Sequence, residues 1–66
     1  MNKKEIIEAL EKLLKEFQSK EMDCFRDIGY MNEHKFHMES EALQYKKEAY
    51  TDCWLRLSSV IDKINN

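Results

Sequence analysis

The sequence contains no proline and only one glycine, Gly29, among its 66 residues. Glycine and proline form most of the tight turns in β-proteins, so their scarcity excludes a fold of many short strands. A single glycine also cannot build the glycine-rich loops that cradle phosphates. With 42% hydrophobic residues, the chain is too apolar for a disordered segment. We therefore expect one small all-α domain.

Cysteine is scarce, with only Cys24 and Cys53, and no uninterrupted apolar run stands near the N-terminus. Secreted domains of this size usually depend on several disulfides, and a signal peptide needs an apolar segment of roughly 7–15 residues. The net charge of −2 provides no general attraction to nucleic acid or to an anionic membrane. We expect a cytoplasmic protein that has two reduced thiols, binds no cofactor and does not associate with membranes.

Apolar residues recur at helical spacing along the first half of the chain. They are Ile6, Ile7, Leu10, Leu13, Leu14, Phe17, Cys24, Phe25 and Ile28. At the start, Asn2 followed by Glu5 is typical of a capping box. This pattern predicts one amphipathic helix over about residues 3–28.

The stretch Met31-Asn32-Glu33-His34-Lys35-Phe36-His37 follows closely behind the only glycine. Gly29 suits the left-handed residue that ends a helix, and Asn32 suits the cap of the next one. Met31 and Phe36 stand at the positions of a hydrophobic staple around that cap. A stop signal and a start signal thus meet within a few residues, and we predict a turn at residues 29–32.

The second half has apolar residues at intervals of seven, which predicts a helix over about residues 33–65. The repeat consists of Phe36, Leu43, Tyr50, Leu57 and Ile64. Trp54 and Ile61 lie on one flank of it, and Ala42, Ala49, Cys53 and Val60 lie on the other. The two predicted helices would pack as an antiparallel hairpin.

Helices with these bounds would be roughly 39 and 50 Å long, so the end of the second would project beyond the first. Two helices also cover each other only along a line, which leaves the flanks exposed. A twofold dimer of hairpins, forming a four-helix bundle, would cover the projecting end and the flanks. The predicted partner or dimer interface consists of Tyr50, Trp54, Leu57, Val60, Ile61 and Ile64.

Metal binding at the turn is one alternative function, with His34, His37 and Glu41 as candidate ligands. The Glu-x-x-His spacing of di-metal bundles is absent, because Met31 and His34 stand three residues before the two histidines. No nucleophile has the glycine-rich turn that would form an oxyanion hole. We expect no metal and no enzymatic activity.

RNA or nucleotide binding is the other alternative, because aromatic and basic residues interleave on the second helix. The candidate contacts are Tyr45, Lys46, Lys47 and Arg56, beside Tyr50 and Trp54. However, Tyr50 and Trp54 fall on the apolar helical face, which favours a place in the bundle core. In architecture and length the chain resembles the small dimeric RNA-binding hairpins that regulate plasmid copy number.

The main functional hypothesis is a small non-catalytic interaction or regulatory protein of bacterial or phage type. A short helical chain without catalytic groups acts by presenting a surface to a protein partner or to another copy of itself. The apolar C-terminal end and the flank around Trp54 form that predicted surface. No motif in the sequence identifies the partner.

Overall fold

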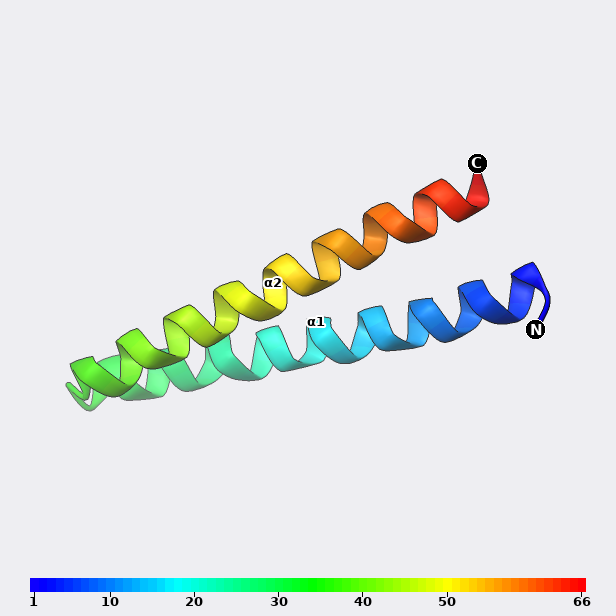
Figure 1. Ribbon diagram of the computed structural model, residues 1–66. Coiled ribbons are helices and arrows are strands. Elements are labelled where there is room, and N and C mark those ends of the chain that lie inside the picture. The colour runs from blue at the N-terminus through cyan, green and yellow to red at the C-terminus, as the bar shows by residue number, and fades with distance from the viewer.

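The computed structural model describes all 66 residues as two helices, α1 (Lys3–Glu33) and α2 (His37–Asn65). The helices run antiparallel and side by side from the turn to the opposite end, which carries both termini (Figure 1). The Cα atoms span 49 Å along the rod and 14 and 13 Å across it. The prediction of an all-α hairpin is confirmed.

Helix α1 begins where the sequence predicts. The Asn2 side chain accepts a hydrogen bond from the Glu5 backbone N–H at 2.8 Å, and its amide donates to the Glu5 carboxylate at 3.4 Å. Two exposed polar groups of the first turn are satisfied in this way. The predicted cap at Asn2 is confirmed.

The turn lies at residues 34–36, so the predicted turn at residues 29–32 is wrong. Helix α1 ends in a Schellman motif in which Lys35 adopts the left-handed conformation, with φ of 61°. The Phe36 N–H donates to the Met31 carbonyl at 2.8 Å, and the Lys35 N–H donates to the Asn32 carbonyl at 3.1 Å. Asn32 does not cap α2; its side-chain oxygen accepts a hydrogen bond from the Ser40 hydroxyl at 2.6 Å.

Gly29 lies within α1 and has no positive φ. A glycine inside a helix costs about 1 kcal/mol relative to alanine, but it does not by itself end the helix. The long apolar face continues through Ile28 and Met31, which are half-buried against α2. Packing of that face therefore outweighs the local cost of the glycine.

Moving the turn changes the register and removes the predicted overhang. The helices contain 31 and 29 residues, so they match in length, and the expectation that the end of α2 projects beyond α1 is wrong. Phe17 packs beside Tyr50, with ring centroids 6.3 Å apart. Ile61 is only 7% exposed, because α1 covers the C-terminal end of α2.

A narrow seam joins the helices, and its residues alternate three and four positions apart on each helix, as in coiled coils. From α1 the seam takes Ile7, Leu10, Leu14, Phe17, Glu21, Cys24, Ile28 and Met31, all buried or half-buried. From α2 it takes Ser40, Leu43, Lys47, Tyr50, Trp54, Leu57, Ile61 and Ile64. Four members of the predicted repeat on α2 are therefore in the seam, whereas Phe36 lies in the turn and is 48% exposed.

Candidate functional site

An open apolar groove of about 350 Å³ runs between the helices in the half of the rod that carries the termini. It is lined by Leu13 and Phe17 of α1 and by Cys53, Arg56, Leu57 and Val60 of α2. Almost all of the surface that these side chains expose in the groove is apolar. Such a shape accommodates an apolar helix surface better than a polar ligand.

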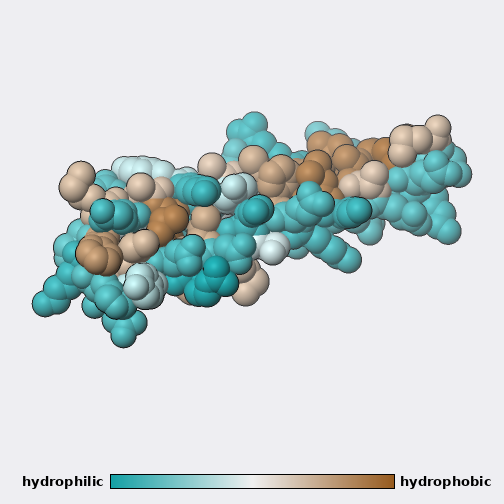
Figure 2. All heavy atoms as spheres, turned by 90° about the horizontal axis from the view of Figure 1, so that it is seen from below, coloured by the Kyte–Doolittle hydropathy of each residue, from teal (hydrophilic) through white to brown (hydrophobic).

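The apolar surface extends beyond the groove toward the termini. Leu13 is 40% exposed and Val60 is 45% exposed, and Ile6, two helical turns before Leu13, is 38% exposed. In Figure 2 apolar atoms gather in a continuous band over the half that carries the termini, whereas charged and polar atoms interrupt them near the turn. The sequence pattern places Ile6, Ile7, Leu13 and Leu14 together on the apolar side of α1. In the structure the seam takes Ile7 and Leu14, and Ile6 and Leu13 remain exposed.

Each helix presents one further row of residues on the side of the groove, at spacings of three and four. The outer stripe of α1 consists of Ile6, Ala9, Leu13, Glu16, Lys20, Asp23 and Asp27. The outer stripe of α2 consists of Glu39, Ala42, Lys46, Ala49, Cys53, Arg56, Val60 and Lys63. The first stripe carries three acids and one lysine, and the second carries three basic residues and one glutamate.

A polar layer crosses the seam near the middle of the rod. The Glu21 carboxylate accepts hydrogen bonds from the Thr51 hydroxyl and from the Trp54 indole N–H, the latter at 3.0 Å. These two hydrogen bonds, with a smaller contribution from the positive charge of Lys47, lower the pKa of Glu21 below its ordinary value of 4.5. The sequence signal for this layer was a glutamate at a seam position, between Phe17 and Cys24.

The structure divides the predicted interface residues between two places. Tyr50, Trp54, Ile61 and Ile64 lie in the seam and contact α1 within the same chain. Leu57 belongs to the seam and also lines the groove, and Val60 lines the groove and is the most exposed of the set. Of these six residues, only Leu57 and Val60 therefore belong to the candidate site.

The predicted nucleic-acid contacts do not form one surface. Tyr45 is exposed and donates a hydrogen bond to Glu41 at 3.4 Å. Lys47 lies in the seam, with its ammonium group 5.8 Å from the centre of the Phe25 ring. Arg56 pairs with Asp52 at 2.9 Å at the rim of the groove, and Lys46 is exposed on the outer stripe of α2. Lys46 and Arg56 therefore share the outer stripe of α2, whereas Tyr45 and Lys47 lie on other sides of the helix.

The three candidate metal ligands lie in or near the turn, and each has different surroundings. The ring Nδ1 of His34 lies 2.9 Å from the Tyr30 carbonyl, and the ring stacks on Tyr30 with centroids 4.2 Å apart. His37 is the exposed first residue of α2, and Glu41 accepts the hydrogen bond from Tyr45. No group of three or more His, Cys, Asp or Glu side chains converges in a way that could hold a metal ion.

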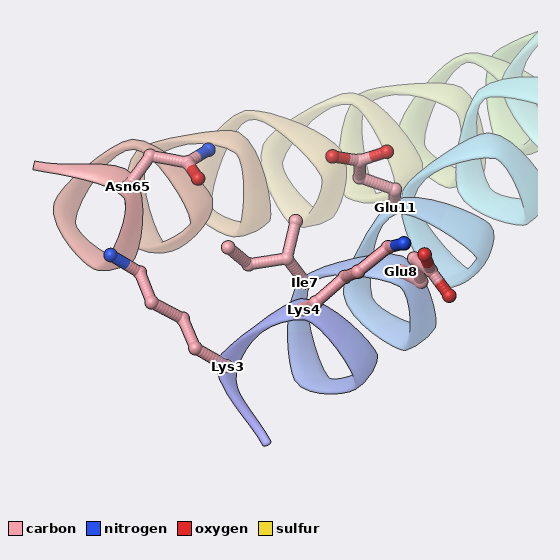
Figure 3. A pocket seen from close by; sticks show the side chains of 6 residues that line it. All are labelled: Lys3, Lys4, Ile7, Glu8, Glu11 and Asn65. Atoms are coloured by element: carbon pink, nitrogen blue, oxygen red, sulfur yellow. The ribbon is translucent and has the colours of Figure 1, made fainter. Parts of the chain in front are cut away.

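A second hollow lies at the end of the rod that carries the termini. Figure 3 shows Ile7 pointing toward α2, with two lysines, two glutamates and an asparagine around it; the lining consists of Lys3, Lys4, Ile7, Glu8, Glu11 and Asn65. This hollow, of about 550 Å³, is larger than the groove, but its lining carries charges of both signs around a single apolar residue, so no single class of ligand is favoured. Neither helix is long and apolar enough to cross a membrane.

The groove is thus the surface of the hairpin that is best suited to binding. Comparison with protein-family models, with curated proteins and with solved structures gives no match to this chain.

Proposed function

We propose that this chain is a non-catalytic interaction protein that self-associates through the apolar groove, so that two hairpins form a four-helix bundle. The groove carries this proposal, because its exposed lining is almost wholly apolar in a chain with 36% charged residues. Apolar patches rimmed by charged residues are typical of association sites. The role would be regulatory, exerted in the cytoplasm by the surface of the assembled protein.

The area that the hairpin exposes supports a second copy as the occupant of the groove. One chain exposes 5271 Å², whereas a compact monomer of 8.0 kDa exposes about 4,500 Å². The excess of about 800 Å² is close to the area that each partner contributes to a stable interface of standard size. Burying this excess against a second hairpin would bring the exposed area of each chain to that of a compact monomer of its mass.

The thin core is the second argument for self-association. Only Cys24, Ser40 and Ile61 are buried, and both cysteines are free of disulfides. Domains below about 70–80 residues usually need disulfides, a metal or oligomerisation to supplement a small core. In this chain association would supply the missing apolar burial.

The substitution Val60→Glu tests the proposal, because Val60 lines the groove but is not in the seam. A single hairpin tolerates the change at this exposed position, whereas a dimer must bury two unpaired carboxylates. We expect dimerisation to weaken by about 3 kcal/mol or more, roughly a hundredfold in Kd. Analytical ultracentrifugation measures the effect, and circular dichroism verifies that the variant is helical.

Leu55→Glu is the matched control, because Leu55 is 52% exposed on the same helix and does not line the groove. It lies about 140° around α2 from Val60. We expect this variant to dimerise like the wild type. Equal weakening by both substitutions, or a folded wild-type monomer at high micromolar concentration, would overturn the proposal.

A further inference from the structure

Two hairpins that meet through their grooves can be related by a twofold axis in two ways. An axis along the rod places the four termini at one end, and each α1 then faces the partner's α2. An axis across the rod places α1 against α1 and α2 against α2, with the two hairpins pointing in opposite directions. The outer stripes distinguish these arrangements, and the inference rests on the proposed self-association.

The large apolar residues of the outer stripes lie toward the termini, whereas the small Ala42 and Ala49 lie toward the turn. Leu13 and Ile6 continue the stripe of α1 toward that end, and Val60 does so on α2. Toward the turn, the positions at the same spacing of seven are charged, with Lys20 and Lys46 the first of them. Complete overlap with the axis across the rod would place the apolar half of one hairpin on the charged half of the other, which removes water from charges without pairing them.

A staggered version with the axis across the rod, in which only the apolar halves overlap, uses only part of the length of each hairpin. Its axis crosses the rod near Leu10, so Asp23 and Asp27 of α1 and Lys46 of α2 lie outside the contact. That version therefore buries less area and leaves the two stripes of opposite sign largely unpaired. With the axis along the rod, the acidic stripe of α1 faces the basic stripe of the partner's α2.

The registers of the two stripes also agree in that arrangement. Phe17 and Cys53 line the groove from opposite helices, which places Glu16 at nearly the same height on the rod as Arg56. Asp52 already contacts Arg56, and Arg26 contacts Asp23 and Asp27, but exposed pairs of this kind contribute little and leave the sign of each stripe unchanged.

We infer that the partner is a second copy bound groove to groove with its termini at the same end, so that the acidic stripe of each α1 meets the basic stripe of the other copy's α2. The two turns then lie together at the far end of the bundle, and the exposed residues around them remain uncovered. Tyr30, Phe36 and Met38 are among these residues.

Chemical cross-linking at the two ends of the rod tests this orientation. His34→Cys and Asn66→Cys each place one reactive thiol at an exposed position, in a Cys53→Ala background where the remaining Cys24 is buried. The two variants are mixed and treated with a short bismaleimide, and the adducts are identified by mass. We expect each variant to cross-link to itself, with no adduct between residues 34 and 66, because these ends lie at opposite ends of a 49 Å rod.

The outcomes separate the orientation from the proposed function. A mixed adduct between residues 34 and 66 would overturn the orientation and leave self-association standing. A dimeric sample in which Asn66→Cys forms no adduct with itself would also overturn the orientation. A wild type that stays monomeric in ultracentrifugation at high micromolar concentration would overturn both.

Discussion

Different forces hold α1 and α2 together in the two halves of the rod. In the half that carries the termini, the seam is purely apolar, and apolar side chains continue outside it into the groove. From the middle to the turn, polar groups enter the seam: Glu21 accepts hydrogen bonds from Thr51 and Trp54, and Ser40 donates to Asn32. Apolar burial stabilises without direction, whereas hydrogen bonds require particular partners.

This difference assigns separate roles to the halves. A hydrogen bond contributes about 0.5–1.5 kcal/mol net, but a polar group left without a partner in a seam costs more than that. A slip of one helix along the other would separate Glu21 from Trp54, so the polar layer selects the observed register. The terminal half provides the larger apolar area and carries the groove through which we propose that the chain self-associates.

The largest expected effect is that of Ile61→Asp in the terminal half. Ile61 is 7% exposed against α1, so the substitution places an unpaired carboxylate in the seam. We expect a loss of about 3 kcal/mol or more, comparable to the whole stability of a domain of this size. Thermal unfolding followed by circular dichroism measures it, with the substitution of exposed Asp62→Ala as control. Cooperative melting at the wild-type temperature would show that this end of α2 lies outside the core.

An intermediate effect is expected for Glu21→Gln in the polar layer. The pKa of Glu21 is lower in the folded chain than its ordinary value of 4.5, so its carboxylate stabilises the fold above that pH. Protonation removes this contribution as the pH falls below about 4.5. We expect the substitution to cost about 1 kcal/mol at neutral pH and less at pH 3.

The difference in unfolding free energy between wild type and Glu21→Gln, measured by urea denaturation from pH 7 to pH 3, checks this prediction. Other carboxylates titrate in both proteins, so the difference isolates Glu21. A difference that stays constant over this range, or grows as the pH falls, would contradict the assigned role of the layer.

The smallest expected effect is a stabilisation by Gly29→Ala. It tests whether Gly29 lies within α1 or in the turn. Gly29→Ala adds a Cβ that meets no atom within 4 Å, at a helical position without positive φ. We expect a stabilisation of about 0.5–1 kcal/mol, because alanine loses less conformational freedom in a helix. Urea denaturation measures it. Destabilisation by a similar amount would place Gly29 in a left-handed turn.

Much of this fold could be predicted from periodicity, but the position of the turn could not. Met31 and Phe36 stand five residues apart, a spacing that suits both a hydrophobic staple at a helix start and the apolar contact of a Schellman motif at a helix end. Gly29 favoured the first interpretation. The left-handed residue is Lys35, which has no local preference for that conformation. An error of one to two helical turns shifted the register and created the false overhang.

The candidate site was predicted only in part for the same reason. The flank of Cys53 and Val60 was recognised beside the apolar repeat, and these residues line the groove. Whether Leu13 or Leu14 faces α2 depends on the register, and spacing alone leaves both on the apolar side. The acidic and basic outer stripes become visible only when both helices are placed beside the groove.

The mass of the wild-type protein in solution, measured by light scattering over a range of concentrations, tests the central claim most directly. The proposed association through the groove predicts that the mass rises from the monomer value of 8.0 kDa to twice that value at micromolar concentrations. A helical, cooperatively folded protein that keeps the monomer mass at several hundred micromolar would contradict it.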